Sequence, residues 1–162
     1  RSGYLSRPAA RESAMRHWMI ALLCVVLGAA GGGAWLWLKA EYRNEPAIAV
    51  ATRFVVLLHD DHLREAYELT LKSDGLAGRN LPQFRQLAAR QRCARGTWQV
   101  YALSPPQSHG NRLRRWLSGR QVEMPSITVR YDFAPNPCPY SIELRRNGQG
   151  QWRVFNFQST AG

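Results

Sequence analysis

The sequence predicts an α+β protein in which one apolar helix precedes a domain of helices packed on an antiparallel sheet. Two observations predict this. Residues 18–38 form an uncharged stretch of 21 residues, about the length of helix that crosses the hydrocarbon core of a membrane. Beyond it, apolar residues recur with a helical period up to residue 91 and with the two-residue period of strands after Gly96. Helices followed by strands are typical of α+β folds.

The apolar stretch carries the residues expected at the two boundaries of a membrane. Trp18 lies at one end of it, and Trp35 and Trp37 lie near the other. Indole rings favour the headgroup region, where an apolar ring can keep its N–H in contact with water. We therefore expect a transmembrane helix at 18–38, between a basic tail at 1–17 and a linker at 39–45.

Flanking charge predicts the orientation of this helix. The tail holds four Arg and one Glu, a net charge of +3, whereas the linker holds two basic and two acidic residues. The positive-inside rule places the tail in the cytoplasm and residues 46–162 across the membrane. For a bacterial cell, this means a single-pass inner-membrane protein with a periplasmic domain.

A cleaved signal peptide is the alternative reading of the same segment, because small residues around Gly28 suit a signal peptidase. The apolar run continues past that point to Leu38, which favours an uncleaved anchor. Both interpretations deliver residues 46–162 to the same compartment.

Three helices are expected at the start of the exported domain, each preceded by a polar residue that can cap it. The first has a proline, Pro46, in its first turn, where the missing N–H costs nothing. Asn80 and Gln83 have the spacing of a capping box. The expected helices cover 46–60, 62–71 and 81–91, capped by Asn44, by Asp60 or Asp61, and by Asn80.

At least four strands follow, because apolar and polar residues alternate in four segments. In the first, Trp98, Val100 and Ala102 share one face, and Leu103 lies on the other. A turn at 147–150 joins the last two strands in a hairpin. The expected strands cover 97–103, 126–133, 140–146 and 151–159.

The segment 105–125 has no clear period. Two alternatives remain open for it: a long loop with a short helix around 112–117, or part of a strand at 121–124.

Three segments together resemble the nuclear-transport-factor-2-like fold, also called cystatin-like or SnoaL-like. They are FVVLLHDDHLREAYELT, the helix that begins Asn-Leu-Pro-Gln-Phe, and the closing strand WRVFNF. The resemblance covers nearly all of 46–162 and implies a cone of helices on a strongly bent sheet. Such a cone can hold a ligand, an active site or nothing, so the fold alone implies no function.

An exported domain of this kind behind one N-terminal span is also similar to the bitopic assembly subunit of bacterial type IV secretion and conjugation machines. This second resemblance is one of architecture, and no residue motif carries it.

Two of the three cysteines lie in the exported domain, and the third, Cys24, lies in the apolar stretch. Thiols oxidise outside the cytoplasm, and two cysteines in one exported domain commonly pair. Cys93 and Cys138 are therefore a disulfide candidate, with two separate buried thiols as the alternative.

No catalytic residue, cofactor or metal ion is predicted. His59 and His62 have a spacing that zinc ligands use, but they flank a helix break, where aspartates are more simply explained as caps. An enzyme of this fold would need an enclosed acid or base with a shifted pKa. Nothing in the sequence singles one out. The residues that could approach such a cavity are Asp132, Tyr101, Tyr131 and Tyr67.

The charge of the exported domain points to an anionic partner. Residues 46–162 hold sixteen basic and eight acidic residues, a net charge of +8. Arg112, Arg114 and Arg115 flank Trp116 in a proline-bounded segment, which suits docking to an acidic protein or to the lipid surface of the inner membrane. Solvated arginines with Trp116 folded back onto the sheet are the alternative.

The combined pattern favours a non-catalytic, membrane-anchored exported domain that binds proteins, as an envelope or secretion assembly component. The alternative is a small-ligand-binding or isomerase/hydrolase-like enzyme that uses the cone. Nucleic acid is not expected as a partner in this compartment, and the sequence leaves open whether the chain forms homo-oligomers.

Overall fold

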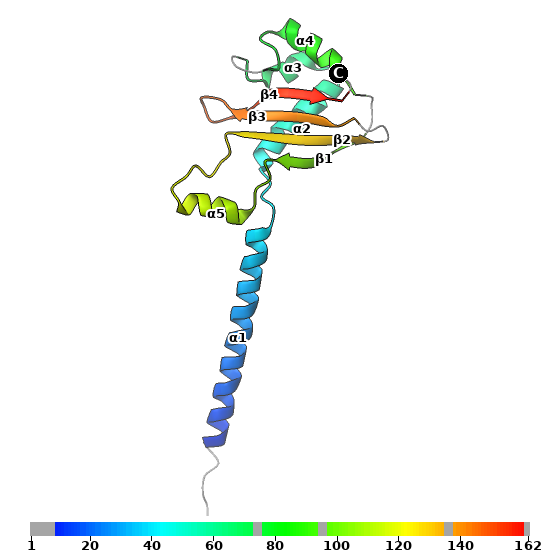
Figure 1. Cartoon of the computed structure of the whole chain (residues 1–162). Coiled ribbons are helices and arrows are strands. Elements are labelled where there is room, and N and C mark those ends of the chain that lie inside the picture. The colour runs from blue at the N-terminus through cyan, green and yellow to red at the C-terminus, as the bar shows by residue number, and fades with distance from the viewer. Residues whose placement is uncertain (1–8, 73–75, 94–96, 135–137, 161–162) are drawn as a thin grey trace, which may run out of the picture.

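The computed structural model describes residues 9–72, 76–93, 97–134 and 138–160. It contains an N-terminal apolar helix followed by a mixed α+β domain with one four-stranded antiparallel sheet (Figure 1). The elements are α1 (Ala9–Lys39), α2 (Glu45–His59), α3 (Leu63–Glu68), α4 (Leu81–Arg90), β1 (Thr97–Ser104), α5 (His109–Leu117), β2 (Ser126–Ala134), β3 (Tyr140–Arg146) and β4 (Trp152–Ser159). Residues 73–75 and the first eight residues of the basic tail lie outside the described residues.

Helix α1 begins well before the predicted span and ends one residue after it. No proline or glycine lies between Ala9 and Trp18 to stop the helix from extending into the basic tail. Within it, Met15–Lys39 is long and apolar enough to cross a membrane. The most apolar part of this segment is not buried against the rest of the structure.

Capping explains where the next helices begin. The Asn44 side chain accepts a hydrogen bond from the Ala47 N–H at 3.3 Å, as predicted, and Asn80 caps α4 by accepting one from the Gln83 N–H at 2.9 Å. The second helix is present as α3, but the cap predicted for it is wrong. Its N-cap residue is His62, whose side chain makes no capping bond, because Asp60 closes α2 and Asp61 turns the chain with a φ of 63°.

The sheet has the strand order β1-β2-β3-β4, with hairpin pairing of β3 and β4 as predicted. A bulge in β1 overturns one predicted face. The register passes from Val100 opposite Tyr131 to Ala102 opposite Arg130, so Tyr101 is an extra residue. An extra residue reverses the alternation that follows it. Leu103, predicted on the face opposite Trp98 and Val100, is therefore buried in the same core against which they pack.

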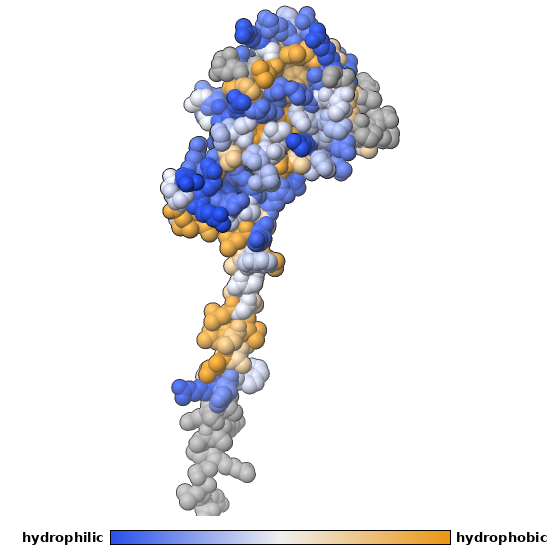
Figure 2. All heavy atoms as spheres, in the orientation of Figure 1, coloured by the Kyte–Doolittle hydropathy of each residue, from blue (hydrophilic) through white to orange (hydrophobic). Residues whose placement is uncertain are grey.

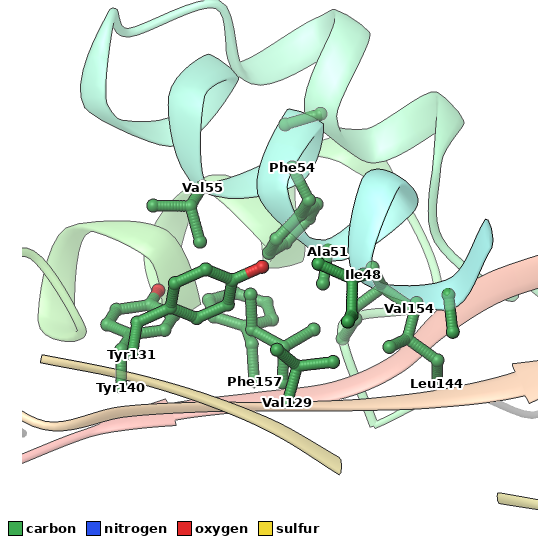
Figure 3. Packing of buried hydrophobic residues seen from close by; sticks show 14 of the residues in the cluster. Ile48, Ala51, Phe54, Val55, Val129, Tyr131, Tyr140, Leu144, Val154 and Phe157 are labelled. Atoms are coloured by element: carbon green, nitrogen blue, oxygen red, sulfur yellow. The ribbon is translucent and has the colours of Figure 1, made fainter. Parts of the chain in front are cut away.

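Helix α2 covers one face of the sheet, and α3 and α4 pack beside it (Figure 1). Figure 3 shows α2 side chains pointing into side chains that rise from the strands, among them Phe54 above Phe157. The rings of Phe54, Phe84 and Phe157 lie 5.2–6.1 Å apart, centroid to centroid. One ring comes from α2, one from α4 and one from β4, so a single aromatic cluster joins both helices to the sheet.

The two outer strands of the sheet differ in how their edges are covered. Val154 of β4 exchanges backbone hydrogen bonds with Leu69 and Leu71, which follow α3. Strand β1 pairs only with β2 among the described strands, and Tyr101 on its bulge is 73% exposed. The domain therefore presents β1 as its open edge.

Candidate functional site

The segment 105–125 contains α5, which lies directly against the end of α1. Ser108 caps α5 by accepting a hydrogen bond from the Asn111 N–H at 3.2 Å. The His109 ring stacks on Trp37 at 4.5 Å between centroids. The backbone N–H of His109 donates a hydrogen bond to the Ala40 carbonyl oxygen at 3.2 Å. Of the two alternatives for this segment, the structure therefore shows the short helix, which starts earlier than 112.

Gly110 makes the join between α5 and α1 close. A Cβ atom placed on Gly110 would lie 2.9 Å from the backbone oxygen of Leu38. Just before the cap of α5, the carbonyl oxygen of Gln107 accepts a hydrogen bond from the Tyr42 N–H at 2.8 Å. Backbone and ring contacts thus hold the end of α1, and the connection that follows it, against the start of α5.

All four residues proposed as an interaction site lie on α5, but they do not act as one set. Arg112 and Arg115 point back to the domain: Arg112 Nη2 lies 2.6 Å from Glu123 Oε1, and Arg115 Nε donates to the Gln121 carbonyl oxygen at 2.7 Å. Arg114 is exposed, and Trp116 is 65% exposed. The interpretation that Trp116 folds back onto the sheet is wrong.

Glu123 gathers three polar groups at the base of the domain. Besides Arg112, its carboxylate accepts a hydrogen bond from Asn44 Nδ2 at 3.1 Å, and Arg146 Nη2 lies 3.8 Å away. The hydrogen bond from Arg112 lowers the pKa of the Glu123 carboxyl, against the opposing effect of partial burial. The Arg112 guanidinium also lies 3.6 Å above the centre of the Tyr42 ring. This group, the Glu123 cluster, connects the α2 cap, α5 and the end of β3.

The sequence prediction does not include Glu123. One signal for it was present, since Glu123 is the single acidic residue between Asp74 and Asp132 in a segment that holds many arginines. A lone carboxylate among arginines favours an ion pair.

Cys93 and Cys138 form a disulfide with Cα atoms 6.0 Å apart. It joins the chain after α4 to the chain before β3. A shallow apolar pocket lies beside it, lined by Val55, Leu58 and Tyr140 among others, with about 420 Å³ of empty volume that includes open solvent. His59 lines this pocket, and its Nε2 atom is buried without a hydrogen-bond partner among the described residues.

The structure does not bring the four residues considered for catalysis together. Tyr101 is exposed on the β1 bulge, and Tyr67 donates its hydroxyl to the Arg79 carbonyl oxygen at 3.0 Å. Tyr131 is buried with its hydroxyl 2.9 Å from Thr52 Oγ1, and burial raises its pKa to about 12. Asp132 follows Tyr131 in β2 and points to the other face of the sheet.

The segment from His59 to His62 does not form a metal-binding group among the described residues. Within the part of the chain that the structure describes, no group of three or more His, Cys, Asp or Glu side chains is placed to hold a metal ion.

The join of α1 to α5, with the Glu123 cluster behind it, thus brings polar and aromatic groups of distant segments together at the surface of the domain. Figure 2 shows apolar residues gathered on the side of α5 that lies toward α1. Comparison of the chain with protein-family models, with curated proteins and with solved structures finds no significant match. The conclusions on function below therefore depend on the geometry of the chain itself.

Proposed function

We propose that this protein is a single-pass membrane protein whose exported domain binds another protein and performs no catalysis. The observation that carries the proposal is the closed join between α1 and the domain. Ring stacking and backbone hydrogen bonds hold the exit of an apolar 25-residue segment, Met15–Lys39, against α5. Such a join fixes the distance and the tilt of the domain above a membrane, which an assembly component needs and a diffusing enzyme does not.

The interior of the domain supports a binding role over a catalytic one. The space between α2 and the sheet is filled by the aromatic cluster of Phe54, Phe84 and Phe157. Tyr140 is buried on the same side of the sheet, and desolvation raises its pKa. A nuclear-transport-factor-2-like cone packed in this way would serve as a rigid scaffold.

The disulfide supports the location. Cys93 and Cys138 are joined, and such bonds persist in oxidising compartments such as the bacterial periplasm. Together with the basic tail, this favours the inner membrane, a cytoplasmic N-terminus and a periplasmic domain. A place in an envelope assembly, such as a secretion or conjugation machine, agrees with this architecture.

The open edge of β1 is the protein-binding surface that the domain offers most directly. An unpaired edge can add a strand from a partner through backbone hydrogen bonds. A photoreactive amino acid at Tyr101 in intact cells should give one discrete cross-linked product, and a matched probe at Gln86 on the exposed side of α4 should give none. A product of twice the chain mass would identify a second copy. No product at Tyr101, or equal products at both positions, would contradict the proposal.

Binding of a small apolar ligand is the second candidate, and one observation favours it: the pocket beside the disulfide, where His59 presents an unpartnered ring nitrogen. Leu63→Trp should fill this pocket. A small apolar acid that raises the melting temperature of the wild type but not of Leu63→Trp would support this candidate, and a panel without such a compound would oppose it.

A further inference from the structure

Helix α5 carries an apolar face that the domain does not cover. Among the described residues after α1, five large apolar side chains are exposed, and three of them are Leu113, Trp116 and Leu117. Their spacing of i, i+3 and i+4 puts them on one face of the helix. No residue of α5 is buried, so the helix gains nothing for the core of the domain from this face.

The same face of α5 meets the end of α1. His109 and Gly110 precede Leu113 and Leu117 by four and seven residues, so all four share one side of the helix. His109 stacks on Trp37, and Gly110 touches Leu38. The exposed apolar face of α5 therefore continues the apolar surface of α1.

The height of α5 follows from these contacts. Residues 37–40 touch the first turn of α5, and they are the residues at which the apolar stretch ends. In Figure 1, α5 runs sideways from the end of α1 and lies on the side of the domain nearest to it. In Figure 2, apolar residues line the edge of α5 toward α1, and hydrophilic residues lie on the opposite edge. With α1 inserted up to Leu38, α5 lies at the headgroup level.

The charge of α5 and of the turn that follows it matches a surface of anionic lipid. Residues 109–120 contain four arginines and no acidic residue. Arg112 and Arg115 are held by Glu123 and by the Gln121 backbone, whereas Arg114 and Arg120 are exposed. A helix with an apolar face, an indole ring and flanking arginines is typical of helices that lie in the interface of a bilayer.

We propose that α5 is an interfacial helix that lies on the outer surface of the membrane spanned by α1. Leu113, Trp116 and Leu117 insert between the lipid headgroups, and Arg114 and Arg120 contact anionic headgroups. This inference rests on the proposed membrane anchor. A bilayer is favoured over a protein partner because the apolar face and the span are one continuous surface, so lipid that surrounds α1 also reaches α5. The domain is then held at two points and cannot rotate freely about α1.

Spin labels in the full chain test this. Single labels are placed by Leu113→Cys on the apolar face, by Asn111→Cys on the opposite face, and by Leu27→Cys within α1, each in a Cys24→Ala background. The oxidised protein is reconstituted in bilayer nanodiscs that contain phosphatidylglycerol. Oxygen relaxes a nitroxide in hydrocarbon, and a water-soluble nickel chelate relaxes one in water. We expect the ratio of the oxygen effect to the nickel effect to be several-fold higher at Leu113→Cys than at Asn111→Cys.

The three labels separate the possible failures. If the label at Leu27→Cys is relaxed like a label in water, the proposed membrane anchor itself is wrong. If Leu27→Cys reads as hydrocarbon while Leu113→Cys reads like Asn111→Cys, only the interfacial helix is overturned, and the apolar face of α5 is then a protein-binding surface.

The role of charge is tested in the same system. Replacing phosphatidylglycerol by phosphatidylcholine should lower the ratio at Leu113→Cys. Arg114→Gln combined with Arg120→Gln should remove this dependence on lipid charge, and Arg64→Gln combined with Arg85→Gln, two exposed arginines outside α5, should not. A ratio that is the same in both lipids would overturn the part assigned to the arginines.

Discussion

Removal of the charge of Glu123 should weaken the base of the domain more than the same change at an exposed acidic residue. Glu123→Gln keeps the shape of the side chain but leaves the Arg112 guanidinium without its counter-charge. The two side chains are 29% and 18% exposed, so solvent screens the pair only in part. Hydrogen bonds to charged groups contribute about 1.5–3 kcal/mol, and we expect a loss of about 2 kcal/mol in the free energy of unfolding.

The pH dependence of this loss has a defined sign. Folding lowers the pKa of the Glu123 carboxyl from its ordinary value of 4.5. The stabilisation is therefore fully present above about pH 4.5 and disappears as the pH falls through the lower pKa of the folded state. The difference between wild type and Glu123→Gln should be constant near pH 7 and shrink toward zero in acid.

Thermal unfolding of the full chain in detergent, followed by near-ultraviolet circular dichroism, measures this difference. A loss of about 2 kcal/mol should lower the melting temperature by roughly 5–10 °C for a domain of this size. Glu65→Gln is the control, because its side chain is 64% exposed, and it should change stability by less than about 0.5 kcal/mol. Equal effects of the two variants at pH 7, or a Glu123→Gln effect that persists unchanged in acid, would refute the role of the Glu123 cluster.

Three further outcomes follow from the packing. Cys93→Ser with Cys138→Ser should cost about 2–4 kcal/mol of stability, measured by urea unfolding under oxidising conditions; an unchanged midpoint would show that the bond does not hold the fold together. Phe84→Ala should cost about 3–5 kcal/mol, since the ring is fully buried among aromatic neighbours, whereas the exposed Gln86→Ala should leave the melting temperature within error. Trp116→Ala should also leave the melting temperature in detergent nearly unchanged, and a large drop would mean that Trp116 packs inside the domain.

Much of the fold was predictable because regular periodicity dominates most segments. The burial of Ile127, Val129 and Tyr131 follows from strict alternation along one strand. The face of Leu103 could not be predicted, since the bulge at Tyr101 is a property of the pairing of two strands, and one segment read alone does not contain it. The cap at His62 was missed for a related reason. Asp60 and Asp61 are better capping residues, but Asp60 ends α2 and Asp61 forms the turn that follows it.

The candidate site was predictable only in part. Arg112, Arg115 and Trp116 were identified because they lie close together in one arginine-rich segment, and they were therefore treated as one site. On a helix, however, neighbours in sequence point in different directions, and Arg112 and Arg115 bind Glu123 and Gln121 while Trp116 faces solvent. The stacking of His109 on Trp37 joins residues 72 positions apart, and no local pattern indicates such a contact.

The central claim, that α1 spans a membrane with the domain on the far side, is tested most directly by labelling cysteines in intact spheroplasts. Gln86→Cys on α4 and Arg16→Cys near the start of α1 are each placed in a Cys24→Ala background, and a membrane-impermeant maleimide is added. We predict that Gln86→Cys reacts at once, and that Arg16→Cys reacts only after the membrane is permeabilised. Protection of Gln86→Cys, or reaction of both cysteines in intact spheroplasts, would contradict it.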